Sequence, residues 1–211
     1  MLDLLGSLTY IGYFLLGTNF ILFLLGLKKF VSRSYFIFTF YLSIIIIIQF
    51  FTAFFKRNGI NNLFLSHLYF VFQFIILSFF YLSILKNKKQ KKIVKYSLLL
   101  CPLILVIQYI FNPELFLRFN LLEIFLTSFL LIIFSMFHFY NILNEKRTYY
   151  YINMGILIYL FGSTVVFLSG NIISVLNFST SKIIWELNSV LYVIYQILIM
   201  VEWFNIRIKK M

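Results

Sequence analysis

The sequence predicts an all-α integral membrane protein, a polytopic bundle of seven transmembrane helices with its N-terminus outside the cell and its C-terminus in the cytoplasm. Of its 211 residues, 63% are hydrophobic and only 11% are charged. A soluble core of this size cannot bury so much apolar surface, so the composition is typical of a membrane protein. The apolar residues also fall into long runs, and Lys and Arg are concentrated in alternate connections between these runs.

Seven apolar runs are long enough to cross a bilayer as helices, which takes about 20 residues each. They lack the alternation of apolar and polar residues that is typical of barrel strands. The runs cover about residues 4–27, 35–55, 63–85, 93–111, 115–140, 149–173 and 183–206. Because the connections between them are short, we predict a single seven-helix domain over residues 1–211.

The basic residues predict the orientation. The connections after the first, third and fifth runs and the C-terminal tail together hold 14 Lys and Arg, against 4 on the other side. The positive-inside rule therefore predicts that these connections lie in the cytoplasm. The bias toward Ile, Phe, Tyr, Asn and Lys fits an AT-rich bacterial genome, so we expect the protein in the inner membrane of a bacterium. The net charge of +12 indicates topology and anionic lipid rather than a nucleic-acid partner. The residues expected to contact a partner or anionic lipid are Lys86, Lys88, Lys89, Lys91 and Lys92.

Polar residues within the runs point to a site. The seventh run contains Glu186, Gln196 and Glu202, and a carboxylate inside a span is costly to insert, so it usually faces protein. Glu186, Ser189 and Gln196 share one side of that helix. Two other runs have polar stripes: Asn62, Ser66, Tyr69 and Gln73 in the third, and Asn120, Glu123, Thr127, His138 and Asn141 in the fifth.

Polar stripes of membrane helices are expected to face other helices. We therefore predict that the third, fifth and seventh runs meet, with Ser66, Gln73, Glu123 and Glu186 facing one another. These groups gather in the outer half of the membrane and predict an outward-opening polar pocket that is also rich in aromatic side chains. The predicted ligand-binding residues are Ser66, His67, Tyr69, Gln73, Glu123, Thr127, Trp185, Glu186 and Gln196.

Small residues recur every seven positions in the sixth run, at Gly155, Gly162 and Ser169. This spacing places them along one seam of a helix. We expect another helix to approach closely along that seam.

Two segments of the chain match in step. Residues 68–77 read LYFVFQFIIL and residues 191–200 read LYVIYQILIM, while residues 33–36 (RSYF) echo residues 147–150 (RTYY). These matches relate the second and third runs to the sixth and seventh, with the fourth as a linker. The division resembles the three-one-three plan of SWEET-type transporters, although the proline-glutamine signature of that superfamily is missing. The resemblance implies transport of a small solute along an axis marked by Gln73 and Gln196.

Four functions are compatible with these features. We expect a receptor or accessory subunit that binds a lipid or small ligand in the outer pocket and acts through a cytoplasmic or membrane protein partner. The alternatives are the transporter, a membrane-disrupting or pore-forming effector, and an intramembrane lipid hydrolase. A monomer and a homo-oligomer are both compatible with the sequence.

The hydrolase would use Glu123, Glu186 and His67 as acid, base or metal ligands. Seven-helix hydrolases of the ceramidase and adiponectin-receptor kind hold zinc with three histidines, whereas this chain has two, His67 and His138, at opposite predicted depths. It also lacks GxSxG and HExxH motifs. We therefore expect no metal, no cofactor and no catalytic residue, although an enzyme is left open.

Overall fold

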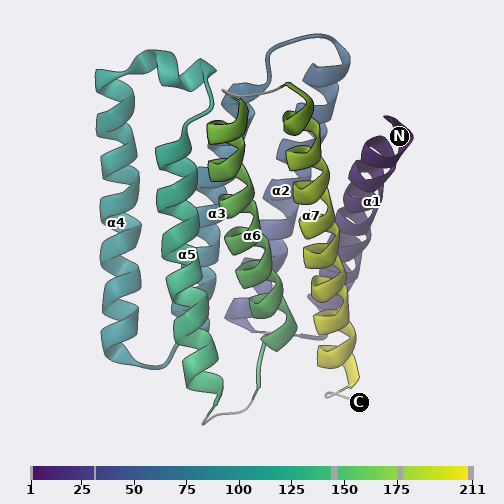
Figure 1. The fold of residues 1–211 in the computed structure, drawn as a ribbon. Helices are drawn as coiled ribbons and strands as arrows, with labels where there is room; N and C mark the ends of the chain where they lie inside the picture. The colour runs from purple at the N-terminus through teal and green to yellow at the C-terminus, as the bar shows by residue number, and fades with distance from the viewer. Residues whose placement is uncertain (1, 31, 144–146, 175–177, 209–211) are drawn as a thin grey trace.

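The computed structural model describes the backbone of residues 2–30, 32–143, 147–174 and 178–208, and their side chains except those of residues 2–6, 170–174 and 178–185. This part of the chain folds into seven α-helices and one short 3-10 helix (Figure 1). All seven α-helices are long and apolar enough to span a membrane, so the all-helical, seven-span prediction is confirmed to that extent. The elements are α1 (Leu2–Gly26), α2 (Arg33–Arg57), α3 (Leu63–Ile84), α4 (Lys88–Phe111), η1 (Pro113–Leu117), α5 (Leu121–Ile142), α6 (Tyr150–Ser174) and α7 (Phe178–Ile208).

The fifth helix begins later than the sequence pattern predicts. The apolar run starts at residue 115, whereas the chain forms η1 there and α5 starts at Leu121. Pro113 lacks an N–H donor and opens the 3-10 turn instead of extending α4. Asn120 then caps α5, because its side-chain oxygen accepts a hydrogen bond from the backbone N–H of Glu123 at 3.3 Å.

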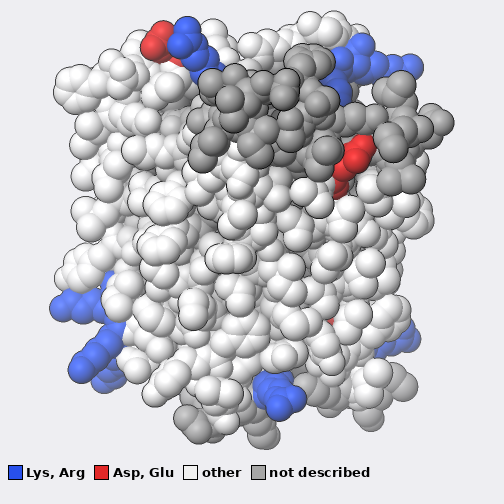
Figure 2. All heavy atoms as spheres, in the orientation of Figure 1, with Lys and Arg blue, Asp and Glu red and all other residues white. Residues whose placement is uncertain are grey.

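Successive helices run in opposite directions, so the connections alternate between two ends of the bundle (Figure 1). We name one of them the basic end, because it holds Lys28, Lys29, residues 86–95, Arg147 and Arg207. The opposite end holds the α2–α3 connection and η1. Figure 2 shows Lys and Arg side chains gathered toward the two ends, with a largely uncharged band between them.

Six of the helices form a closed ring. In the order α1, α2, α3, α5, α6, α7, each helix contacts the next, and α7 contacts α1 in turn. The helix α4 lies outside this ring, against α3 and α5 (Figure 1). In this ring α7 stands across from α3, and within the described residues its backbone does not pack against α3 or α5.

The predicted small-residue seam of α6 faces α7. A Cβ atom added at Gly155 would lie 2.8 Å from Cδ2 of Tyr195, and one added at Gly162 would lie 2.7 Å from Cδ1 of Leu191. Both distances are too short for a side chain, so glycine is what permits this close approach of the helices. The prediction is confirmed for these two glycines, whereas Ser169 is exposed.

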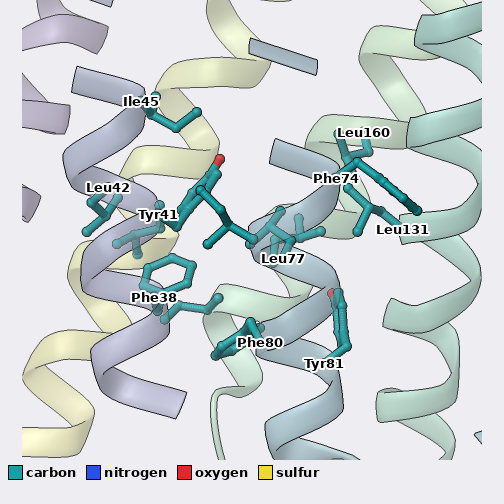
Figure 3. Close-up of a cluster of buried hydrophobic side chains, with 14 of the residues drawn as sticks. Phe38, Tyr41, Leu42, Ile45, Phe74, Leu77, Phe80, Tyr81, Leu131 and Leu160 are labelled. Atoms are coloured by element: carbon teal, nitrogen blue, oxygen red, sulfur yellow. The ribbon is translucent and has the colours of Figure 1, made fainter. Parts of the chain in front are cut away.

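Aromatic side chains fill the ring toward the basic end (Figure 3). Phe38 of α2 and Phe80 of α3 are completely buried, with ring centroids 5.4 Å apart. Phe74 and Tyr81 of α3 extend this packing to Phe134 of α5, at centroid distances of 6.5 and 6.1 Å. This half of the ring is therefore a packed core, and an internal site has room only in the other half.

Candidate functional site

A pocket of about 560 Å³ opens at the opposite end, inside the ring. Five ring helices and the segment before α5 line it, and its size is typical of small-molecule sites. The polar lining residues are Thr9, Gln49, Thr52, Lys56, Asn62, Ser66, Asn188 and Ser189. The aromatic lining residues are Tyr13, Tyr69, Phe70, Phe119, Tyr159, Phe167 and Tyr192.

A layer of tyrosines and one glutamine closes the pocket toward the basic end. The hydroxyls of Tyr69 and Tyr159 lie 3.3 Å apart. Beneath them, Tyr41 accepts hydrogen bonds from Gln73 Nε2 at 3.2 Å and from the Tyr195 hydroxyl at 3.3 Å. Tyr41, Gln73 and Tyr195 are each at most 2% exposed. We name these five residues the tyrosine layer; the packed core of Figure 3 continues below it.

The structure brings the polar faces of α3 and α7 to one pocket. Ser66 and Tyr69 line it from α3, while Asn188 and Ser189 line it from α7. The polar stripes of these two helices therefore border one pocket, but the helices do not meet directly as predicted, because α7 does not pack against α3. Gln196 lies deeper, where its side-chain oxygen and its backbone carbonyl accept hydrogen bonds from Asn19 Nδ2 of α1 at 2.9 and 2.8 Å.

A second polar cluster lies outside the ring, between α3, α4 and α5. Nδ1 of His67 is 3.0 Å from Oε2 of Glu123, and the Tyr109 hydroxyl of α4 donates a short hydrogen bond to the same oxygen. His67 and Glu123 are 4% and 0% exposed. The ring of Phe116 stacks on His67, with centroids 5.7 Å apart. We name His67, Tyr109 and Glu123 the His–Glu–Tyr cluster.

Hydrogen bonds extend the cluster to two amides. Asn120 Nδ2 donates to the Tyr109 hydroxyl at 3.2 Å, and Asn120 and Gln108 exchange two hydrogen bonds at 3.0 and 3.3 Å. With His67 Nδ1–H and Tyr109 O–H both donating to Glu123, every contact has one donor and one acceptor. Two buried atoms of the cluster have no hydrogen-bond partner among the described residues, Nε2 of His67 and Oε1 of Glu123.

A histidine held through Nδ1 by a carboxylate, with Nε2 unpaired, is an arrangement used by general bases. Here neither His67 nor Glu123 lines the pocket, so a molecule in the pocket does not reach them. Within the described residues no three His, Cys, Asp or Glu side chains come together to hold a metal ion. The geometry therefore favours a role in fixing α4 to its neighbours.

The prediction that Glu123 and Glu186 face one another is wrong. Glu123 turns toward α4, and α7 carries Glu186 in a helix that does not pack against α5. The reason is that the polar stripe of α5 is covered by α4, outside the ring, and a stripe does not show which helix covers it. On α3, by contrast, consecutive residues point about 100° apart and serve different regions. Ser66 faces the ring interior, while His67 faces α4. Tyr109 was not among the predicted site residues, because its only signal is a hydroxyl and an adjacent amide in an otherwise apolar run.

The remaining predicted site residues are dispersed. Thr127 is buried and donates to the backbone carbonyl of Glu123 at 2.7 Å, within its own helix. Glu186 is half-buried on α7 and is not among the residues that line the pocket. The predicted residue Trp185 lies outside the part of the chain whose side chains are described.

Two reciprocal amide pairs fasten α4 to the ring. Gln108 pairs with Asn120 at the opposite end, and Gln90 pairs with Asn141 at the basic end, with distances of 2.9 and 3.3 Å in the second pair. Amide hydrogen bonds between helices hold membrane helices together where lipid offers no competing partner. The polar stripe of α5 is thus used largely for contacts with α4.

Glu202, the second carboxylate predicted within the seventh span, connects α7 to α6. This carboxylate of α7 is 1% exposed, and its Oε2 accepts a hydrogen bond from the backbone N–H of Tyr151 at 2.7 Å. Tyr151 lies in the first turn of α6, where N–H groups lack partners within the helix. A negative charge is favourable at that end of a helix, so Glu202 stabilises the contact of α6 with α7.

The lysines of the predicted contact surface lie at the start of α4, at the basic end. The helix begins at Lys88, and the side-chain oxygen of Asn87 caps it by accepting a hydrogen bond from the N–H of Lys89 at 2.9 Å. Lys92 lies over the ring of Tyr96, 5.7 Å from its centroid. Four of the five predicted lysines are exposed, and Lys91 is partly buried.

The fold and site thus define a protein of seven helices with membrane-spanning character, with a closed-ended pocket in a six-helix ring. No protein-family model, no curated protein and no solved structure matches the chain. Its function is therefore inferred from its own residues.

Proposed function

We propose that this protein is a membrane receptor or accessory subunit, which binds a lipid or small ligand in the ring pocket and acts through a protein partner. The observation that carries the proposal is a pocket of about 560 Å³ that the tyrosine layer closes at its inner end. A closed-ended pocket retains a ligand, whereas a channel needs a continuous path through the protein. From the positive-inside rule we further propose that this pocket opens to the outer side, and that the membrane is a bacterial cytoplasmic membrane.

The partner is proposed to act at the basic end. The described residues there form helix ends and short connections, and the most concentrated charge is the lysine group at positions 86, 88, 89, 91 and 92. Such a group attracts acidic protein surfaces and anionic lipid headgroups near the membrane. Ligand binding on one side and partner contact on the other would then be linked through the ring helices.

Native mass spectrometry of the protein, released from a gentle detergent, tests the proposal. We expect a retained small molecule or lipid, together with a co-purified partner protein. Changing Lys88, Lys89, Lys91 and Lys92 to Gln should reduce the partner signal and leave the small molecule in place. A protein that carries neither a small molecule nor a partner would contradict the proposal.

One observation favours the transporter as a second candidate. The ring consists of two consecutive triplets, α1–α3 and α5–α7, with α4 outside it, as a three-one-three division requires. Tyr69 and Tyr192, which correspond in the two matching segments, both line the pocket, and the corresponding Gln73 and Gln196 are both buried beneath it. Two such halves can open a site alternately to each side by rocking.

Liposomes that contain only this protein distinguish the candidates. A receptor or accessory subunit moves no solute by itself. Solute flux that is lost in Gln73→Leu or Gln196→Leu would replace the receptor proposal by the transporter. Unselective leakage would favour the pore-forming effector, and turnover of a lipid ester, ether or amide would favour the hydrolase.

A further inference from the structure

The charge of the pocket has one sign. Among the lining residues that the structure describes, Lys56 is the single charged one, and no carboxylate lines the pocket. Lys56 lies in the last turn of α2 and is exposed, so its ammonium group is at the rim rather than at depth. An exposed ammonium with no carboxylate among the described lining residues favours an anionic group on a ligand at the rim.

The interior of the pocket is mostly aromatic and aliphatic, with a few amides. Phe70, Phe119 and Phe167 provide apolar walls, and Gln49 and Asn188 provide amide groups. Oδ1 of Asn188 is buried without a hydrogen-bond partner in the described structure. The walls of the pocket are thus mostly apolar, which suits a hydrocarbon chain.

Building on the proposed function, we propose that the pocket takes an anionic amphiphile. Its carboxylate or phosphate head would lie near Lys56 at the rim, and its hydrocarbon body would lie among the aromatic walls. An anionic phospholipid of the surrounding bilayer and a free fatty acid share this chemistry. The phospholipid would enter the pocket from the bilayer, whereas the fatty acid would be supplied as a free molecule. The experiment below separates these two sources.

The test uses the full-length protein in phosphatidylcholine nanodiscs, with the neutral fluorophore N-dodecyl dansylamide as probe. Three competitors share a twelve-carbon chain and differ in the head: laurate, dodecanol and dodecyltrimethylammonium. The variant Ser66→Phe, which places a phenyl ring inside the pocket to obstruct the probe, measures probe that merely dissolves in the bilayer. The subtracted signal then reports the pocket alone.

We expect laurate to displace the probe about fivefold better than dodecanol, the size of an exposed ion pair. The preference should weaken as salt is added, because the rim is open to solvent. Lys56→Gln should abolish the preference and Lys56→Glu should turn it toward dodecyltrimethylammonium. Arg57→Gln makes the same charge change at the neighbouring position, which does not line the pocket, and should leave the preference unchanged.

A second arm replaces part of the phosphatidylcholine with phosphatidylglycerol. Weaker probe binding in these discs, lost in Lys56→Gln, identifies the bilayer as a source of the ligand; unchanged probe binding identifies the free acid. Equal displacement by all three competitors would overturn the anionic assignment and keep the ligand-binding pocket. No probe signal above that of Ser66→Phe, with no molecule retained in native mass spectrometry, would overturn the proposed function as well.

Discussion

The ring pocket and the His–Glu–Tyr cluster lie on different sides of α3 and differ in what their polar groups contact. The pocket lies inside the ring, opens at one end, and leaves an amide oxygen of Asn188 unpaired. The cluster lies outside the ring, is covered by Phe116, and its polar groups mostly bond one another. Ser66 lines the pocket, whereas the next residue, His67, belongs to the cluster. Residue type alone would favour the histidine and the glutamate as a functional site, whereas access from outside the protein favours the pocket, as proposed above.

The largest expected effect is on the cluster. Glu123→Leu removes the acceptor shared by His67 and Tyr109, and leaves them only the contacts that they make with each other and with Asn120. Breaking such a set is expected to lower the free energy of unfolding by about 3 kcal/mol. Thermal unfolding in detergent measures it, with Glu123→Gln as the milder control, since the amide keeps the shape and one acceptor oxygen.

Binding of the dansylamide probe in the pocket should be unaffected by Glu123→Leu. Because Glu123 does not line the pocket, the folded fraction of this variant should bind the dansylamide probe like the unaltered protein. If Glu123→Leu kept its full stability and lost probe binding, the cluster rather than the pocket would be the binding site.

A smaller effect is expected at the two amide pairs that fasten α4. Gln108→Leu and Gln90→Leu should each lower the free energy of unfolding by about 1 kcal/mol, a typical value for one interhelical polar contact. The two positions lie roughly 27 Å apart along the helix, so their effects should add in the double variant. A double variant no less stable than either single one would mean that α4 is held by its apolar contacts alone.

The sequence predicts the spans, their alternation and the faces of α3 and α7, because each follows from one helix at a time. Run length, the count of basic residues, and the spacing of Gly155 and Gly162 are properties of single segments. The order of helices in the ring is different, since a polar stripe shows which face avoids lipid but not which helix covers it. The stripe of Glu123 and Asn141 therefore predicts an interior face correctly and its neighbour wrongly. The matching segments set the fourth run apart as a linker, but nothing in its own apolar sequence indicates that it supplies Tyr109 to that stripe.

The smallest effect on stability and the largest on binding are expected from the same change, Ser66→Phe. Ser66 lines the pocket and its hydroxyl donates only to the carbonyl of Leu63 in its own helix, at 2.5 Å. A phenyl ring placed there extends into open space, so the free energy of unfolding should change by no more than about 0.5 kcal/mol. Ser83→Phe is the matched control: Ser83 lies on the same helix, donates to Phe80 in the same way at 2.6 Å, and does not line the pocket. Probe binding that disappears in Ser66→Phe and persists in Ser83→Phe would separate the two regions of α3, whereas binding that survives in both would place the ligand outside the ring.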